Sequence, residues 1–377
     1  MNPATTAPRE GRLLYRCARG LPDFSLIRRL VHQGIDWPAF HALAEAHHLS
    51  ALCCRRLESA CPELIPQETL ASLRGMLRRN VERNLFFAGE LGRILARLAE
   101  GGVRALAFKG PVLAWWLYDH PGVRDATDLD LLIDEADLGR ACALLADLGY
   151  HEERADNGAS KIVNSEGQIA LLRKAPHSIL DLHWELAPHA MGLEWNAREA
   201  WRRSAVVSVA GRPVETFGTE DQVLYCALHG GKHGWARLSW LADLSALIEI
   251  RPPDWARLLA QARRQRLTRA LLVGLHLAQE LLDTPLPGEI GELLDRPNAS
   301  ARMAREARAH LLDGPPGSQL VARELAYEWH LTEGWARRAQ FVWRKITEPS
   351  SADWQDRRST RPLRLMWKYV ARLTACW

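Results

Sequence analysis

The hydrophobic residues of this 377-residue chain change their spacing twice, and this change constrains the fold more than any other feature. Through residues 24–100, apolar side chains recur every three or four positions, which is typical of amphipathic helices. Between 103 and 216 the apolar runs are short or alternating, with turn residues between several of them, which indicates strands. Helical spacing returns at Thr219. The pattern predicts an α+β fold in which a mixed sheet with flanking helices lies between two helical regions.

The boundaries follow from the points at which the pattern changes. Gly101-Gly102 ends a long predicted helix, as glycine commonly does, and Gly211-Arg212 predicts a hairpin near the end of the strand-rich part. We therefore expect a flexible N-terminal segment (1–23), an N-terminal helical region (24–100), a sheet-containing core (101–217), a C-terminal helical domain (218–345), and a linker with a basic terminal helix (346–377).

Composition narrows the class of protein. Hydrophobic residues make up 47% and charged residues 25%, which is ordinary for a globular chain. A net charge of only +4 argues against a specific nucleic-acid partner, which would favour a basic face. The seven cysteines form no Cys-x-x-Cys pair, and no apolar run reaches the length of a membrane span. We expect a cytoplasmic protein.

The sequence DLDLLI (128–133) is the most informative short motif. In an extended strand, residues two apart point the same way, so Asp128 and Asp130 share one face while Leu129 and Leu131 face the core. Two aligned carboxylates repel each other unless a cation lies between them, and a hard divalent ion such as Mg²⁺ is the usual solution. The alternative is a solvated edge strand with two surface acids.

Two neighbouring features favour the metal site. Lys109-Gly110 lies where a short apolar strand meets the N-terminus of a helix, a place suited to binding phosphate. Asp181 lies within the otherwise apolar run ILDLHWEL, where a carboxylate needs a partner. That partner is either a metal ion or a nearby arginine.

The ordered series of motifs resembles a known family. The order of strand, turn, helix, Asp-x-Asp and later acid is similar to that of the polymerase-β-type nucleotidyltransferase superfamily, although Lys109-Gly110 replaces the usual Gly-Ser. The resemblance is narrower to a family of largely uncharacterised bacterial nucleotidyltransferases, often encoded beside polysaccharide or peptide natural-product genes. It covers roughly residues 100–290 and is carried by Lys109-Gly110, Tyr118, Arg124, DLDLLI, LADLGY (145–150), DLHW (181–184), the segment 228–248, DWARLLAQA and LHLAQELLDTPLP.

This resemblance implies a two-metal reaction with Mg²⁺ or Mn²⁺. An acceptor hydroxyl would displace pyrophosphate from an NTP, with ATP the expected donor, and the metals would stabilise the attacking and leaving oxygens. It assigns Asp128 and Asp130 to both metals and Asp181 to the catalytic metal. Lys109 and Arg124 would neutralise the triphosphate. A plain ion pair of Arg124 with Asp125 or Asp128 is an equal alternative.

Histidines supply a candidate substrate pocket. His229 and His233 lie four apart on one helical face, a spacing that can hold zinc, but no third ligand is evident, and packing or substrate contact is the better interpretation. We expect parts of the segment 229–243 to face the carboxylates across a cleft. His183, two residues after Asp181, either joins the site or bonds a buried group.

The predicted function is transfer of a nucleoside monophosphate from an NTP to a small molecule, peptide or protein, in a natural-product or polysaccharide pathway. The alternative is a non-catalytic protein that binds nucleotide or a partner through a degenerate fold, which the missing Gly-Ser turn favours. The C-terminal segment RRSTRPLRLMWKYVARLTACW carries basic residues and no acid. It suggests contact with an anionic membrane surface or an acidic protein, or simply a terminal helix packed on the body.

Overall fold

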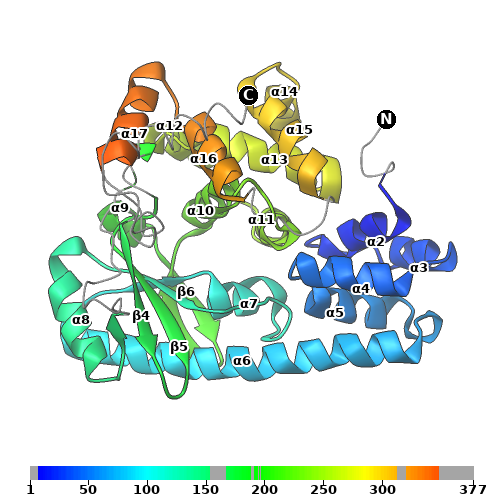
Figure 1. The fold of residues 1–377 in the computed structure, drawn as a ribbon, viewed down its shortest axis with the longest axis horizontal. Helices are drawn as coiled ribbons and strands as arrows, with labels where there is room; N and C mark the ends of the chain where they lie inside the picture. The colour runs from blue at the N-terminus through cyan, green and yellow to red at the C-terminus, as the bar shows by residue number, and fades with distance from the viewer. Residues whose placement is uncertain are drawn as a thin grey trace, which may run out of the picture.

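A computed structural model describes residues 7–152, 167–187, 191–193, 195, 197–311 and 320–347 of the chain. The predicted basic segment after residue 347 therefore lies outside the described residues. Within the described parts, no helix combines the length and the apolar character that crossing a bilayer requires. The fold is α+β, as predicted: a five-stranded mixed sheet lies among many helices (Figure 1).

The N-terminal helices pack as a group at one end of the molecule (Figure 1). They are α2 (Arg9–Ala18), α3 (Phe24–His32), α4 (Trp37–Ala46), α5 (Ser50–Ala60) and the short 3-10 turn η1 (Pro62–Leu64). Asp36 caps α4, since its side chain accepts from the backbone N–H of Ala39, as the Asp-Trp-Pro sequence predicts. Residues 9–18 were expected to be flexible, but they form α2 because Leu13, Leu14 and Cys17 repeat at helical spacing and are buried.

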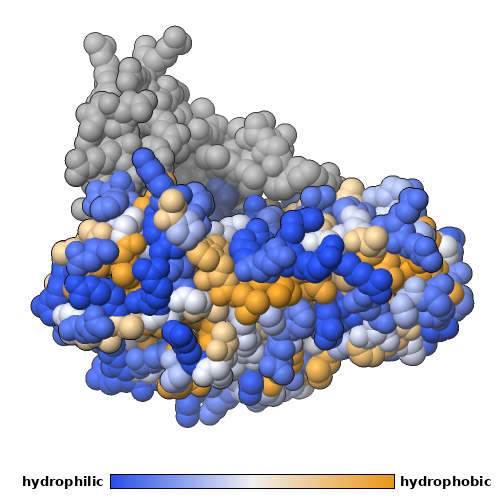
Figure 2. All heavy atoms as spheres, turned by 90° about the horizontal axis from the view of Figure 1, so that it is seen from below, coloured by the Kyte–Doolittle hydropathy of each residue, from blue (hydrophilic) through white to orange (hydrophobic). Residues whose placement is uncertain are grey.

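Helix α6 (Gln67–Glu100) runs along the molecule and joins its two ends (Figure 1). Leu70 and Leu73 at its start belong to the core of the helical regions, whereas Leu91 and Ile94 belong to the core beneath the sheet. Figure 2 views the molecule from the side on which α6 lies and shows hydrophilic residues with a broken apolar band among them. A single helix thus fixes the sheet relative to the N-terminal helices.

The central region holds both sheets. Its elements are β1 (Leu106–Phe108), α7 (Gly110–Tyr118), β2 (Leu129–Leu132), η2 (Glu135–Asp137), α8 (Leu138–Ala146), β3 (His151–Glu152), β4 (Gln168–Arg173), β5 (Ser178–His183), α9 (Ala197–Arg202), β6 (Ala205–Val209) and β7 (Arg212–Thr216). The main sheet has the order β1-β2-β5-β4-β3, in which only β2 and β5 run parallel. β6 and β7 form the predicted hairpin, whose turn residues Ala210 and Gly211 both have positive φ.

The C-terminal helices share a core with the N-terminal ones. They are α10 (Thr219–Lys232), α11 (Leu238–Ile250), α12 (Trp255–Gln265), α13 (Thr268–Leu282), α14 (Gly288–Leu294), α15 (Ala299–Leu311), α16 (Leu320–Leu331) and α17 (Trp335–Thr347). One cluster of buried side chains includes both Leu13 and Leu244. At Gly20 a Cβ would lie 2.7 Å from the Cα of Ala246, so only glycine permits this approach. The two helical regions therefore form one body beside the sheet.

A buried ion pair between β4 and α6 gives a test of how the sheet packs against this helix. Arg173 of β4 bonds Glu90 of α6, and the side chains are 7% and 4% exposed. Arg173→Met should lower the free energy of unfolding by about 3 kcal/mol, because it leaves a buried carboxylate with fewer partners. Arg140→Met is the control: its side chain is 58% exposed, so its pair with Asp137 should be worth less than about 1 kcal/mol. Urea denaturation measures the loss of stability in both variants. Equal losses would contradict the conclusion that the pair of Arg173 with Glu90 is buried and that of Arg140 is exposed.

Candidate active site

Parallel pairing of β2 with β5 brings the predicted acids together. Asp130 lies directly opposite Asp181 in the register. Paired residues of neighbouring strands point to the same face, and so does His183, two residues after Asp181. Asp130, Asp181 and His183 each offer a ligating atom, and these atoms all lie within 4.8 Å of one another. Among the residues that the structure describes, this is the group suited to holding a metal ion.

The two oxygens of Asp130 have different surroundings. Oδ1 accepts a hydrogen bond from Lys109 Nζ at 2.8 Å and lies 3.2 Å from His183 Nε2. Oδ2 is buried, with no hydrogen-bond partner among the described residues. Burying an unpartnered carboxylate oxygen is unfavourable. Two neighbouring carboxylates, one of them with an unpartnered buried oxygen, fit a divalent cation, which prefers oxygen ligands.

The electrostatics point the same way. Burial, then the charges of Asp130 and Asp128, raise the pKa of Asp181 to about 7. Burial and Asp130 also raise the pKa of Asp128. Burial acts against ionisation of Asp130 too, but the Lys109 ammonium and His183 hold the pKa of this carboxyl below its ordinary value. The cluster therefore carries more negative charge than its protein neighbours balance.

Lys109 and Gly110 form the turn from β1 into α7. Lys109 has a φ of 57° and Gly110 a φ of 40°. A Cβ on Gly110 would lie 3.2 Å from the carbonyl oxygen of Asp128, so glycine suits this close approach. The Lys109 ammonium lies 5.3 Å from the ring centroid of Tyr225 and 5.8 Å from that of Phe108. The turn thus places the Lys109 ammonium against Asp130 and beside the rings of Tyr225 and Phe108.

Arg124 pairs with a residue that lies far away in the sequence. Its Nε donates to Asp243 of α11 at 2.8 Å, so the pair formed is with neither Asp125 nor Asp128. Its Nη1 donates to the carbonyl oxygen of Gly110 at 3.3 Å. Nη2 has no hydrogen-bond partner in the described part of the chain. The guanidinium is held in place beside the Gly110 turn with donor capacity left over.

A cavity of about 610 Å³ opens beside Lys109, Gly110, Arg124 and Asp128. The opposite wall includes His229, His233, Trp240 and Glu324. His233 Nδ1 lies 2.6 Å from Glu324 Oε1, and the ring of His229 packs edge-on against those of His233 and Trp240. Both histidines and Trp240, from the segment 229–243, therefore line the same cavity as Asp128. Trp235, in contrast, is fully buried in the helical core.

Sequence reasoning missed several residues of this region, Tyr225 and Glu324 among them. Tyr225 lies under Lys109, and the series Tyr225, His229, His233 at intervals of four on α10 was a signal that could have found it. Glu324 comes from α16, and nothing local connects it with the site.

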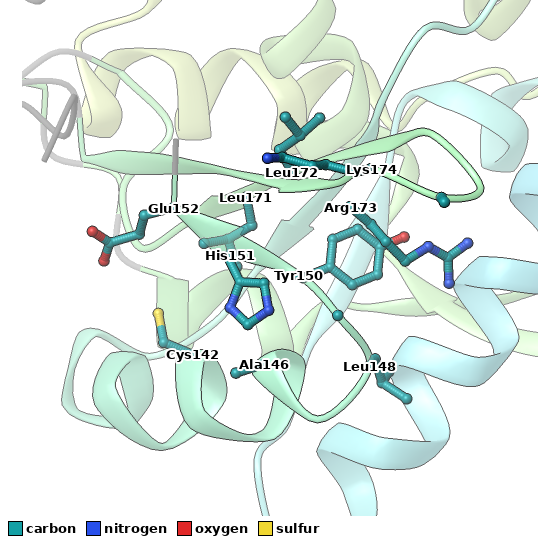
Figure 3. Close-up of a pocket in the computed structure, with 12 residues that line it drawn as sticks. Cys142, Ala146, Leu148, Tyr150, His151, Glu152, Leu171, Leu172, Arg173 and Lys174 are labelled. Atoms are coloured by element: carbon teal, nitrogen blue, oxygen red, sulfur yellow. The ribbon is translucent and has the colours of Figure 1, made fainter. Parts of the chain in front are cut away.

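A second cavity, of about 1000 Å³, lies between α8 and the strands β3 and β4 (Figure 3). Figure 3 shows Tyr150 and Arg173 along it. Both side chains already bond Glu90. Asp128, His229 and His233 line the smaller cavity and not this one, so the smaller cavity is the candidate active site. Asp130, Asp181 and His183 line neither of the two cavities.

Comparison with known proteins shows the family to which the chain belongs. Residues 33–283, more than half of the chain, match the model of a family described as "Uncharacterised nucleotidyltransferase". The chain belongs to this nucleotidyltransferase family. A solution structure of the antibiotic-resistance factor ANT(2'')-Ia is similar over 60% of this chain and 97% of that one, with 18% identity and a TM-score of 0.30, too low to add to the assignment. The comparison with curated proteins finds no match.

Removing one of the crowded charges of this nucleotidyltransferase should stabilise its metal-free form. Asp181→Asn should raise the free energy of unfolding in EDTA by roughly 2 to 4 kcal/mol at pH 8. The folded pKa of about 7 lies above the ordinary 3.8, so the wild-type penalty grows as pH rises through this interval and is complete above it. Urea denaturation at pH 5 and pH 8 should show the gain shrinking at the lower pH. The exposed-acid control Glu135→Gln should show neither effect, and a less stable Asn variant at pH 8 would contradict the reasoning.

Proposed function

We propose that this nucleotidyltransferase moves a nucleoside monophosphate from an NTP, with ATP the expected donor, to a hydroxyl of a small molecule, peptide or protein, using Mg²⁺ or Mn²⁺. The observation that carries the proposal is the register of Asp130 against Asp181, together with the buried Oδ2 of Asp130, which has no partner among the described residues. The adjoining cavity, with a helix N-terminus and an arginine on its wall, supports the same conclusion.

Asp130 and Asp181 would hold the divalent ion, and Asp128 lies at the edge of the cavity beside them. When bound, the ion supplies positive charge to the phosphate oxygens around the reacting phosphorus. His183 fixes the Asp130 carboxylate from the side away from Oδ2. Asp181 is the candidate to accept the proton of the acceptor hydroxyl.

The triphosphate would lie against the start of α7. Backbone N–H groups at a helix N-terminus favour anions, and Gly110 lets them approach closely. Arg124 offers Nη2 from the same side, while Asp243 keeps the guanidinium oriented. A planar guanidinium that is already fixed loses little freedom when it bonds phosphate.

The acceptor would occupy the opposite wall. His229, His233, Trp240 and Glu324 line the cavity there, and His233 Nδ1 lies 2.6 Å from Glu324 Oε1. Cavities of this kind, with stacked rings and a few convergent polar groups, fix the orientation of a ligand that has both apolar faces and hydroxyls. The alternative, a nucleotide-binding protein without transfer activity, predicts NTP binding with no pyrophosphate release.

Transfer itself provides the central test. The wild-type protein, given each labelled NTP with Mg²⁺ or Mn²⁺ and pooled small-molecule and peptide acceptors, should release pyrophosphate and form a labelled product. Asp130→Asn should reduce the rate at least about a hundredfold, the scale expected when an electrostatic stabiliser of the transition state is lost. Glu135→Gln, an exposed acid five residues further on, should retain activity. Wild-type rates in Asp130→Asn would refute the metal assignment.

Arg124 has a separate test. Arg124→Met should weaken NTP affinity about tenfold or more, because a charge-assisted hydrogen bond to phosphate is lost. Titration calorimetry in Mg²⁺ measures this, and Arg93→Met, whose side chain is 54% exposed, is the matched control. Unchanged NTP affinity with lowered stability would leave Arg124 as a structural tie to Asp243 only.

A further inference from the structure

The contacts of Asp130 limit how many ions its carboxylate can bind. A carboxylate that bridges two metal ions gives one oxygen to each. Here Oδ1 already accepts from Lys109 Nζ at 2.8 Å and lies 3.2 Å from His183 Nε2. Only Oδ2 has no partner among the described residues. One oxygen is thus left for a metal.

Lys109 is held where it is from several sides. Its ammonium lies over the rings of Tyr225 and Phe108, at 5.3 and 5.8 Å from their centroids. Its backbone is the N-cap of α7, so the side chain starts from a fixed point. The side chain is 16% exposed and also lines the cavity beside Asp128. Lys109 therefore contacts the central carboxylate through its ammonium and belongs to the lining of the cavity proposed for the triphosphate.

We propose that Lys109 takes the electrostatic place of one ion of a two-metal site, so that the protein binds a single divalent ion through Asp130 Oδ2 and Asp181. This inference rests on the proposed function. The composition of the ligand cluster supports it: Asp130, Asp181 and His183 have atoms within mutual reach, and Asp128 is not among them. A lysine ammonium is a compact point charge with three donors, so it can contact Asp130 and a phosphate oxygen together.

The test counts bound Mn²⁺ on the full-length protein by equilibrium dialysis, with and without a saturating α,β-methylene NTP, and records the electron paramagnetic resonance spectrum of the complex. We expect one ion per chain and no exchange coupling. Two ions, with the coupling expected for metals roughly 3.5–4 Å apart, would overturn the inference and leave the proposed function intact. No bound ion in either condition would overturn both.

Lys109→Met keeps the length of the side chain and removes its charge, so Oδ1 becomes available. We expect this variant to bind two ions with a coupled spectrum, whereas Lys109→Arg should keep one. Lys232→Met is the charge-matched control, because the Lys232 ammonium also acts on Asp181 but belongs to α10. This control should bind one ion. A single ion in Lys109→Met would overturn the inference, and if that variant does not fold, the wild-type count still decides.

Discussion

Repulsion between carboxylates on adjacent strands is the constraint to which the surrounding structure responds. Asp130 and Asp181 are paired in register, and Asp128 lies close enough to raise the pKa of Asp181 further. The β1–α7 turn brings Lys109 onto this cluster. A non-glycine residue at positive φ is strained by on the order of 1 kcal/mol or more, and Lys109 has a φ of 57°. Neutralising a buried carboxylate offsets that strain, which explains why the chain keeps a lysine there.

The helical regions hold the other wall of the cavity in position. Asp243 of α11 accepts from Arg124 at 2.8 Å and from the Tyr118 hydroxyl at 3.2 Å, so one carboxylate joins the C-terminal helices to the turn and helix of the core. The N-terminal helices share a core with α11 and α13, and α6 carries them to the sheet. The C-terminal helices are thus joined to the sheet-containing core in two ways. One is the set of contacts made by Asp243, and the other is the shared helical core that α6 connects to the sheet. Packing, rather than a loop, sets the distance between the two sides of the cavity.

Local patterns predicted most of the helices and strands, including the two strands that carry Asp130 and Asp181. Period-two spacing placed Asp130 on a strand, and the apolar run around Asp181 placed it on another. The order of the strands did not follow from these patterns, because adjacent pairing depends on contacts between distant segments. Arg124 shows the same limit: the sequence offered the nearby Asp125 and Asp128, but the partner formed is Asp243, 119 positions away. Helix α14 has only seven residues, too few for a clear helical period in the sequence.

The contacts of Lys109-Gly110 change how its departure from the usual Gly-Ser turn is interpreted. In the sequence, Lys109-Gly110 favoured a degenerate site, because the residues typical of the superfamily were missing. In the structure the lysine contacts the central carboxylate, and the glycine permits the approach to Asp128. The lysine and the acids therefore form one charged cluster at this turn, in which Lys109 balances part of the negative charge.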